Sequence, residues 1–144
     1  KEKYDELITF FEKNESRNTA ESFYLGISYY KKNQFTKAES IFKALYKSES
    51  TIEMTTYYII SKIKLGKNDE ANRLYKDFCE KENKTITTYL KNRDYQNALA
   101  ICLLLKSIPI ELPKNEPVSN DLIELTNGFN YSELSLELAK KINH

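Results

Sequence analysis

The feature that most constrains the fold of this 144-residue chain is a short pattern that occurs three times. In each copy an aromatic or polar residue is followed three positions later by alanine, and four positions after that by a bulky residue. The copies are QFTKAESIFKAL around Ala38, LGKNDEANRLYKDF around Ala71 and DYQNALAICLLL around Ala98. An alanine lets two helices approach closely, and the bulky residue fills the space beside it. Because the pattern recurs, it predicts an all-α chain of stacked helix pairs, which is an α-solenoid.

The most complete helix pair is predicted at about residues 19–47. Its first helix carries an apolar stripe at i, i+3, i+4, i+7 and i+10 spacing, which is typical of a helix with one packed face. The stripe consists of Ala20, Phe23, Tyr24, Ile27 and Tyr30. A short polar turn leads into a second helix, which places Ala38 and Phe42 on one face.

This helix pair resembles a tetratricopeptide repeat. The signature positions of that family are occupied by Leu25-Gly26, Tyr29, Ala38, Phe42 and Leu45. Ser22 stands at the usual tryptophan position, and the usual late proline is missing. The resemblance implies an α-solenoid of antiparallel helix pairs that has no catalytic activity and binds a protein or peptide.

Further repeats are predicted at about residues 51–80 and 84–106. Ala38 and Ala71 are 33 positions apart, close to the family period, whereas Ala71 and Ala98 are only 27 apart. The helix before Tyr95 is therefore expected to be short. A helix at about residues 4–14 matches the second helix of a pair, and it is interpreted either as part of a further repeat or as a single capping helix.

The composition changes after Ser107, because all three prolines follow within a few residues. Proline ends helices, so residues 107–118 are predicted to be a linker, and residues 119–144 a two-helix C-terminal cap. The helix before the linker is apolar on nearly all sides, so later residues are expected to pack over it. Two alternatives for the C-terminal helices are a ubiquitin-associated domain, which Gly128-Phe129 resembles, and half of a helix-turn-helix.

The resemblance also implies where a partner binds. In that family the first helices of successive pairs line a concave groove. The groove candidates in this chain are Phe23, Ile27, Tyr30, Lys31, Thr56, Ile60, Ile63 and Lys64, with Ala20 and Glu53 beside them. Such an apolar groove suits a partner helix that inserts anchors at i, i+3 or i+4, and i+7. The competing interpretation is that Phe23 and Ile27 belong to the core.

Two functions remain open from the sequence. The first is a non-catalytic protein-interaction module, and the alternative is a structural subunit of a permanent assembly, which includes self-association into a homo-oligomer. The two would differ in the size of the apolar surface and in whether the molecular mass depends on concentration. Neither interpretation indicates the cellular compartment.

Charge and reactive residues argue against other functions. A net charge of +1, from 22 basic and 21 acidic residues, gives no electrostatic case for nucleic acid. The only histidine is His144, so no Ser-His or Cys-His catalytic pair is predicted within the chain.

Cys79 and Cys102 are too few for a zinc site and are expected to be buried thiols, with a disulfide between them as the alternative. A hydrolase with paired carboxylates would need a shaped pocket that no motif indicates. No cofactor, metal ion or membrane span is expected.

Overall fold

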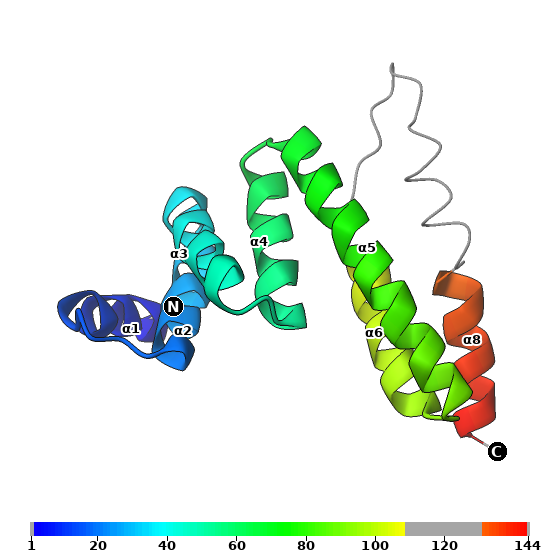
Figure 1. The fold of residues 1–144 in the computed structure, drawn as a ribbon. Coiled ribbons are helices and arrows are strands. Elements are labelled where there is room, and N and C mark those ends of the chain that lie inside the picture. The colour runs from blue at the N-terminus through cyan, green and yellow to red at the C-terminus, as the bar shows by residue number, and fades with distance from the viewer. Residues whose placement is uncertain (1, 109–130, 144) are drawn as a thin grey trace. The chain divides into compact units, whose positions relative to one another are not determined.

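The computed structural model describes residues 2–108 and 131–143, and the regular elements within them are helices (Figure 1). The prediction of an all-α chain is confirmed. The helices are α1 (Glu2–Lys13), α2 (Thr19–Lys31), α3 (Phe35–Ser48), α4 (Ile52–Lys64), α5 (Asn68–Lys91), α6 (Tyr95–Ser107) and α8 (Tyr131–Ile142). The chain forms two compact units, Lys1–Ala71 and Asn72–His144, and the division between them falls within α5.

Polar side chains fix where α2 and α4 begin. Asn18 accepts a hydrogen bond from the backbone N–H of Glu21, and the Glu21 carboxylate accepts one from the N–H of Asn18, which is a capping box. Thr51 caps α4 by accepting from the N–H of Met54 at 3.2 Å. Both side chains accept hydrogen bonds from backbone N–H groups in the first turn of the helix. These groups would otherwise have no partner.

Three of the helix-to-helix turns share one backbone conformation. Asn33, Gly66 and Arg93 have positive φ angles of 61°, 76° and 57°. In each turn the N–H of the following residue donates to the carbonyl five positions before it, at 2.8–2.9 Å: Gln34 to Tyr29, Lys67 to Lys62 and Asp94 to Tyr89. This is the Schellman arrangement that ends helices. The turns are 33 and then 27 positions apart, as the alanine pattern is, so the backbone repeats with the sequence.

Close contact between α2 and α3 explains the small residues of the first pair. A Cβ atom added at Gly26 would lie 2.7 Å from Cε1 of Phe42, so only glycine fits this approach. Ala38 and Phe42 are completely buried. The first unit extends on both sides of this pair, because α1 packs on α2 and α3 packs on α4.

Helix α5 corrects the helix boundary that was predicted near residues 80–84. It is a single helix of 24 residues, Asn68–Lys91, and it replaces the expected end near Glu80 and the short new helix after Lys84. No glycine or proline interrupts this range, and the charged residues in its middle are good helix formers. This explains why Ala71 and Ala98 are only 27 positions apart. The single helix α5 connects the turn at Gly66 to the turn at Arg93, and no residues are used for a further turn near residue 80.

In the second unit, α8 packs on α6, and hydrogen bonds join both helices to α5 (Figure 1). Tyr75 of α5 donates to the carbonyl of Leu105 at 3.3 Å, and Tyr131 of α8 donates to Oδ1 of Asn83 at 2.6 Å. Cys79 and Cys102 are buried and free, so they form no disulfide with each other.

The C-terminal predictions are described only in part. α6 buries Ala98, Ile101, Cys102 and Leu105, and α8 packs on it, so the expectation that later residues pack over this helix is confirmed, although Leu103 is 48% exposed. The second predicted C-terminal helix is observed as α8. The linker beyond Ile108 and the first of the two C-terminal helices, with Gly128-Phe129, lie outside the described residues.

Candidate interaction surface

The candidate groove residues all belong to the first unit, and two of them contribute to packing between its helices. The rings of Phe23 and Tyr30 on α2 contact the ring of Tyr57 on α4, with centroids 5.7 and 5.8 Å apart. Phe23 also contacts Phe42, and Tyr30 contacts Phe35. Phe23 and Tyr30 are therefore half-buried members of an aromatic cluster that joins α2, α3 and α4.

On α4 the candidates differ in how much they expose. Ile60 and Ile63 are half-buried, and Lys64 is exposed. Thr56 is only 6% exposed, and its hydroxyl donates to the carbonyl of Ile52 at 2.8 Å. Thr56 thus offers little surface to a partner, because its side chain is turned back onto its own helix.

Tyr24 is an exposed aromatic residue that the list of groove candidates omitted. Its side chain is 57% exposed, and its ring lies 6.4 Å from that of Phe23. Ala20 and Lys31 are also exposed and Ile27 is half-buried, so α2 presents one stripe at i, i+4, i+7 and i+11 spacing. Tyr24 stood in the predicted apolar stripe, which is typical of a packed face, so the sequence pattern did not indicate its exposure.

The stripe of α2 recurs on α4. Both helices contain Tyr-x-x-Ile-Ser-x-x-Lys, and each residue of one copy stands 33 positions from its counterpart. The paired positions are Tyr24 and Tyr57, Ile27 and Ile60, Ser28 and Ser61, and Lys31 and Lys64. The two serines are buried, whereas the two isoleucines are half-buried and the two lysines are exposed. The tyrosine, isoleucine and lysine positions are named here the duplicated stripe.

The two copies of the duplicated stripe run in the same direction. Tyr30, at the end of α2, contacts Phe35, at the start of α3. Leu65, directly after α4, lines a hollow together with the same residue Phe35. The C-terminal ends of α2 and α4 therefore both lie at the beginning of α3.

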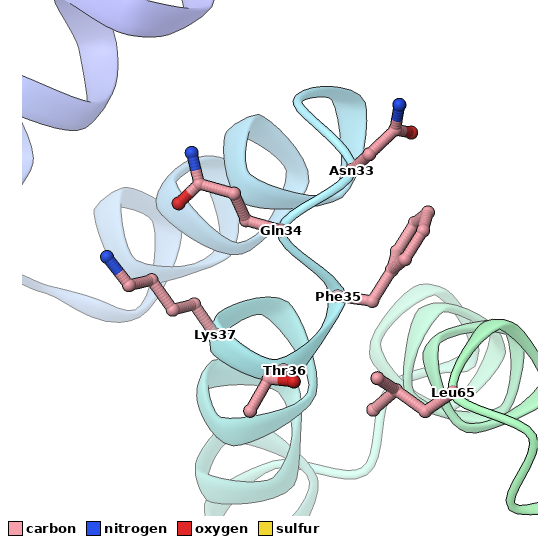
Figure 2. A pocket seen from close by; sticks show the side chains of 6 residues that line it. All are labelled: Asn33, Gln34, Phe35, Thr36, Lys37 and Leu65. Carbon is pink, nitrogen blue, oxygen red and sulfur yellow. The ribbon is translucent and has the colours of Figure 1, made fainter.

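The hollow has a volume of about 320 Å³, near the lower end of the range for ligand pockets. Figure 2 shows the Phe35 and Leu65 side chains at its apolar side, while Gln34 and Lys37 extend toward the other side. Asn33 and Thr36 complete the lining. The hollow lies directly after the lysine ends of the duplicated stripe.

An ionic cluster with the buried pair Lys62 and Glu39 at its centre joins α4 to α3. Lys62 of α4 donates to Glu39 of α3 at 2.8 Å and to Glu70 at 3.1 Å, and Lys67 donates to Glu39 at 2.8 Å. Burial alone would raise the pKa of Glu39, but the hydrogen bonds and charges of Lys62 and Lys67 outweigh it and lower that pKa. Nothing in the sequence pattern predicted this cluster, because Lys62 stands in an otherwise ordinary helical position.

A second exposed surface lies on α1. Phe10 is 64% exposed, and it borders an open hollow of about 430 Å³ together with Asp5, Glu6, Thr9 and Lys13. Unlike the duplicated stripe, this surface comes from a single helix and has both acidic and basic side chains. It is the main competitor for partner binding within the first unit.

Within residues 2–108 and 131–143, no group of three or more His, Cys, Asp or Glu residues could hold a metal ion. None of the helices described there is long and apolar enough to cross a membrane. Burial raises the pKa of the Cys102 thiol to about 11, so this cysteine is a poor nucleophile at neutral pH.

Comparisons with known proteins gave no match: no family model matches the chain, and no curated protein or solved structure does. The tetratricopeptide resemblance therefore stays a prediction from the residues that carry it.

Proposed function

We propose that this chain is a non-catalytic protein-interaction module that binds a helix of a partner protein on the surface of α2 and α4. The observation that carries the proposal is the duplicated stripe, which presents Tyr24 and half-buried Ile27 and Ile60 on two helices of one unit. Apolar side chains that stay accessible on adjacent elements are typical of interaction sites. Aromatic anchors at such sites contribute a large share of the binding energy.

The proposal includes a tetratricopeptide-like stacking of helix pairs. It is supported by the Schellman turns at Asn33, Gly66 and Arg93 and by the close approach of Gly26 to Phe42. In such an array each pair covers the apolar face of its neighbour, and terminal elements have to cover the last one. We assign that terminal role to α8, because it packs on the apolar helix α6.

Site-specific photo-crosslinking tests the binding surface. A benzoylphenylalanine at position 24 should crosslink a partner protein in cells, because this side chain is exposed and would lie in the interface. The matched control carries the same group at position 10, where Phe10 is equally accessible but lies on α1. Crosslinking from position 10 with none from position 24 would move the site to α1.

A charge substitution completes this test. Tyr24→Glu should abolish partner binding and leave the helix content unchanged, since Tyr24 contributes little to the core. Phe10→Glu introduces the same charge on α1 and should leave partner binding intact. Retention of the partner by folded Tyr24→Glu protein would contradict the proposal.

The second candidate function is a structural subunit of a permanent or self-associated assembly. It is favoured by Phe10, whose 64% exposure is the largest among the bulky apolar residues described. Analytical ultracentrifugation over a hundredfold range of concentration separates the two functions. The structural subunit would be supported if the molecular mass doubles as the concentration rises and if Phe10→Glu protein stays a monomer.

A further inference from the structure

The duplicated stripe forms two rows across α2 and α4. The two helices run in the same direction, and each carries tyrosine, isoleucine and lysine in that order from its N-terminal to its C-terminal end. Ile27 and Ile60 therefore form an aliphatic row, and Lys31 and Lys64 a basic row. The tyrosines differ, because Tyr24 is exposed whereas the Tyr57 ring stacks on the buried Phe42. A segment that crosses both helices would meet isoleucine and lysine twice.

The basic row is available to a partner, whereas neighbouring lysines are engaged within the unit. Lys32 pairs with Asp5 at 3.1 Å, Lys67 pairs with Glu39 at 2.8 Å, and Lys62 is buried in the ionic cluster. Lys31 and Lys64 are exposed, and neither forms an ion pair with any residue that the structure describes. Their charges are thus left for a complementary anion.

The spacing of the rows indicates the repeat of the partner. Packed helices lie about 8–10 Å apart, and about seven residues of an α-helix rise over a similar distance. A helix that crosses α2 and α4 would therefore place residues seven positions apart over the two copies of the stripe. Tyr24 and the aliphatic row would contact its apolar face, and the basic row would contact one flank.

We infer that the partner segment is an amphipathic helix that crosses α2 and α4, with acidic side chains repeated about every seven residues along the flank facing Lys31 and Lys64. The inference rests on the proposed function and names the chemistry of the partner at that site. The inference is based on charge complementarity, because two exposed lysines beside an apolar surface favour a partner helix with an acidic flank. It also fixes the orientation of the flank, since the lysines lie only at the C-terminal ends of α2 and α4.

A simpler role for these lysines is to complement the negative ends of the two helix dipoles. That role predicts a small change in stability when the lysines are replaced and no preference for acidic partners. The two roles are therefore separated by measuring binding and thermal stability on the same variants.

The experiment is a selection from a displayed library of 18-residue helical peptides on the whole chain. The library has a fixed apolar face and randomises both flanks. The selection is repeated on a Lys31→Glu/Lys64→Glu variant. A Lys43→Glu/Lys47→Glu variant is the matched control, because these exposed lysines lie on α3 and the change in charge is the same.

The expected result is enrichment of Asp or Glu on one flank, about seven positions apart, in peptides selected on the wild type and on the control. The Lys31→Glu/Lys64→Glu variant should instead select Lys or Arg there. Replacing the two acidic residues of a selected peptide by their amides should weaken binding to the wild type by about three- to tenfold, as expected for two exposed ion pairs.

Two outcomes would overturn the inference, and they differ in what else they overturn. Peptides that lose affinity for Tyr24→Glu protein but show no acidic preference would refute the inference and leave the proposed binding surface standing. A selection that yields only peptides unaffected by Tyr24→Glu and by Ile27→Glu would refute the binding surface, and the inference with it.

Discussion

Lys62 donates a hydrogen bond to Glu39 at 2.8 Å, although both residues are less than a tenth exposed. The pair joins α4 to α3, and Lys62 also lies 4.9 Å from the centre of the Tyr58 ring. Burial alone would lower the pKa of Lys62, but its hydrogen bonds to Glu39 and Glu70 raise it. Both partners are therefore charged over the whole neutral range, and neither can be removed without leaving a buried charge.

Removing the acidic partner should destabilise the first unit strongly. Glu39→Ala should lower the free energy of unfolding by about 3 kcal/mol, because a buried ammonium group loses its main partner. The control is Glu70→Ala, which removes a side chain that is 48% exposed and should cost less than about 1 kcal/mol. Urea denaturation monitored by circular dichroism gives both values, and equal losses would contradict the buried pair.

A second buried glutamate should have the opposite dependence on pH. Burial raises the pKa of Glu82, which is 2% exposed, above its ordinary value of 4.5. Its protonated form is favoured in the folded state, so its contribution is present below pH 4.5 and is lost as the pH rises through the folded pKa. The lowered pKa of Glu39 has the reverse effect, with stability present above pH 4.5 and lost as the pH falls through the folded pKa.

Glu82→Gln should therefore gain stability relative to the wild type at pH 7, and the gain should shrink toward pH 4. The reason is that the amide needs no deprotonation in a buried site. Thermal midpoints measured at both pH values test this, with Glu80→Gln on the exposed side of α5 as the control. A loss of stability at pH 7 would mean that the Glu82 carboxylate is favourably paired.

The approach of Gly26 to Phe42 should tolerate no added methyl group. Gly26→Ala should lower the free energy of unfolding, because overpacking costs about 1–3 kcal/mol and exceeds the gain in helix propensity of about 1 kcal/mol. Ala38→Leu should act in the same way, because Ala38 is completely buried. The double variant Gly26→Ala/Phe42→Leu should lose less than the sum of its single variants, and simple additivity would argue against the contact.

Replacing Tyr24 or Tyr30 of α2 by alanine should have very different effects on stability, because Tyr24 is exposed and Tyr30 is packed between helices. Tyr30→Ala should cost about 3 kcal/mol, since its ring packs against Phe35 and Tyr57. Tyr24→Ala should cost less than about 0.5 kcal/mol, as expected for an exposed side chain. Similar losses for both variants in thermal denaturation would mean that Tyr24 is not free for a partner.

The sequence pattern predicted helices and turns well where it contained residues that end a helix. Asn33 and Gly66 adopt the left-handed conformation that ends α2 and α4, and both stood in polar turns of the repeated pattern. The close packing of Gly26 and Ala38 was predicted for the same reason, because small residues at fixed spacing reflect helix contact. The duplicated stripe was also present in the sequence, and comparing the two first helices at an offset of 33 would have found it.

Features that depend on residues from separate helices could not be predicted in this way. A stripe on α2 alone does not reveal that Tyr57 of α4 contacts Phe23 and Tyr30 and partly covers them. The burial of Lys62 depends on Glu39, which is 23 positions away. In both cases the environment of a residue is set by packing that its own helix does not encode.

The continuity of α5 offers the sharpest test of where the repeat pattern failed. Lys84 is exposed and lies inside this helix, whereas the pattern predicted that a new helix begins there. Proline is tolerated in the first turn of a helix but costs about 3 kcal/mol or more in the interior, where it removes a hydrogen bond and clashes with the preceding turn. Lys84→Pro should therefore destabilise the second unit by about that amount, and Lys84→Ala should change its stability by less than about 0.5 kcal/mol. Hydrogen exchange of the α5 amides, with urea denaturation, measures the effect. A Lys84→Pro protein as stable as Lys84→Ala would mean that the chain does turn near residue 84, and it would restore the predicted third helix pair.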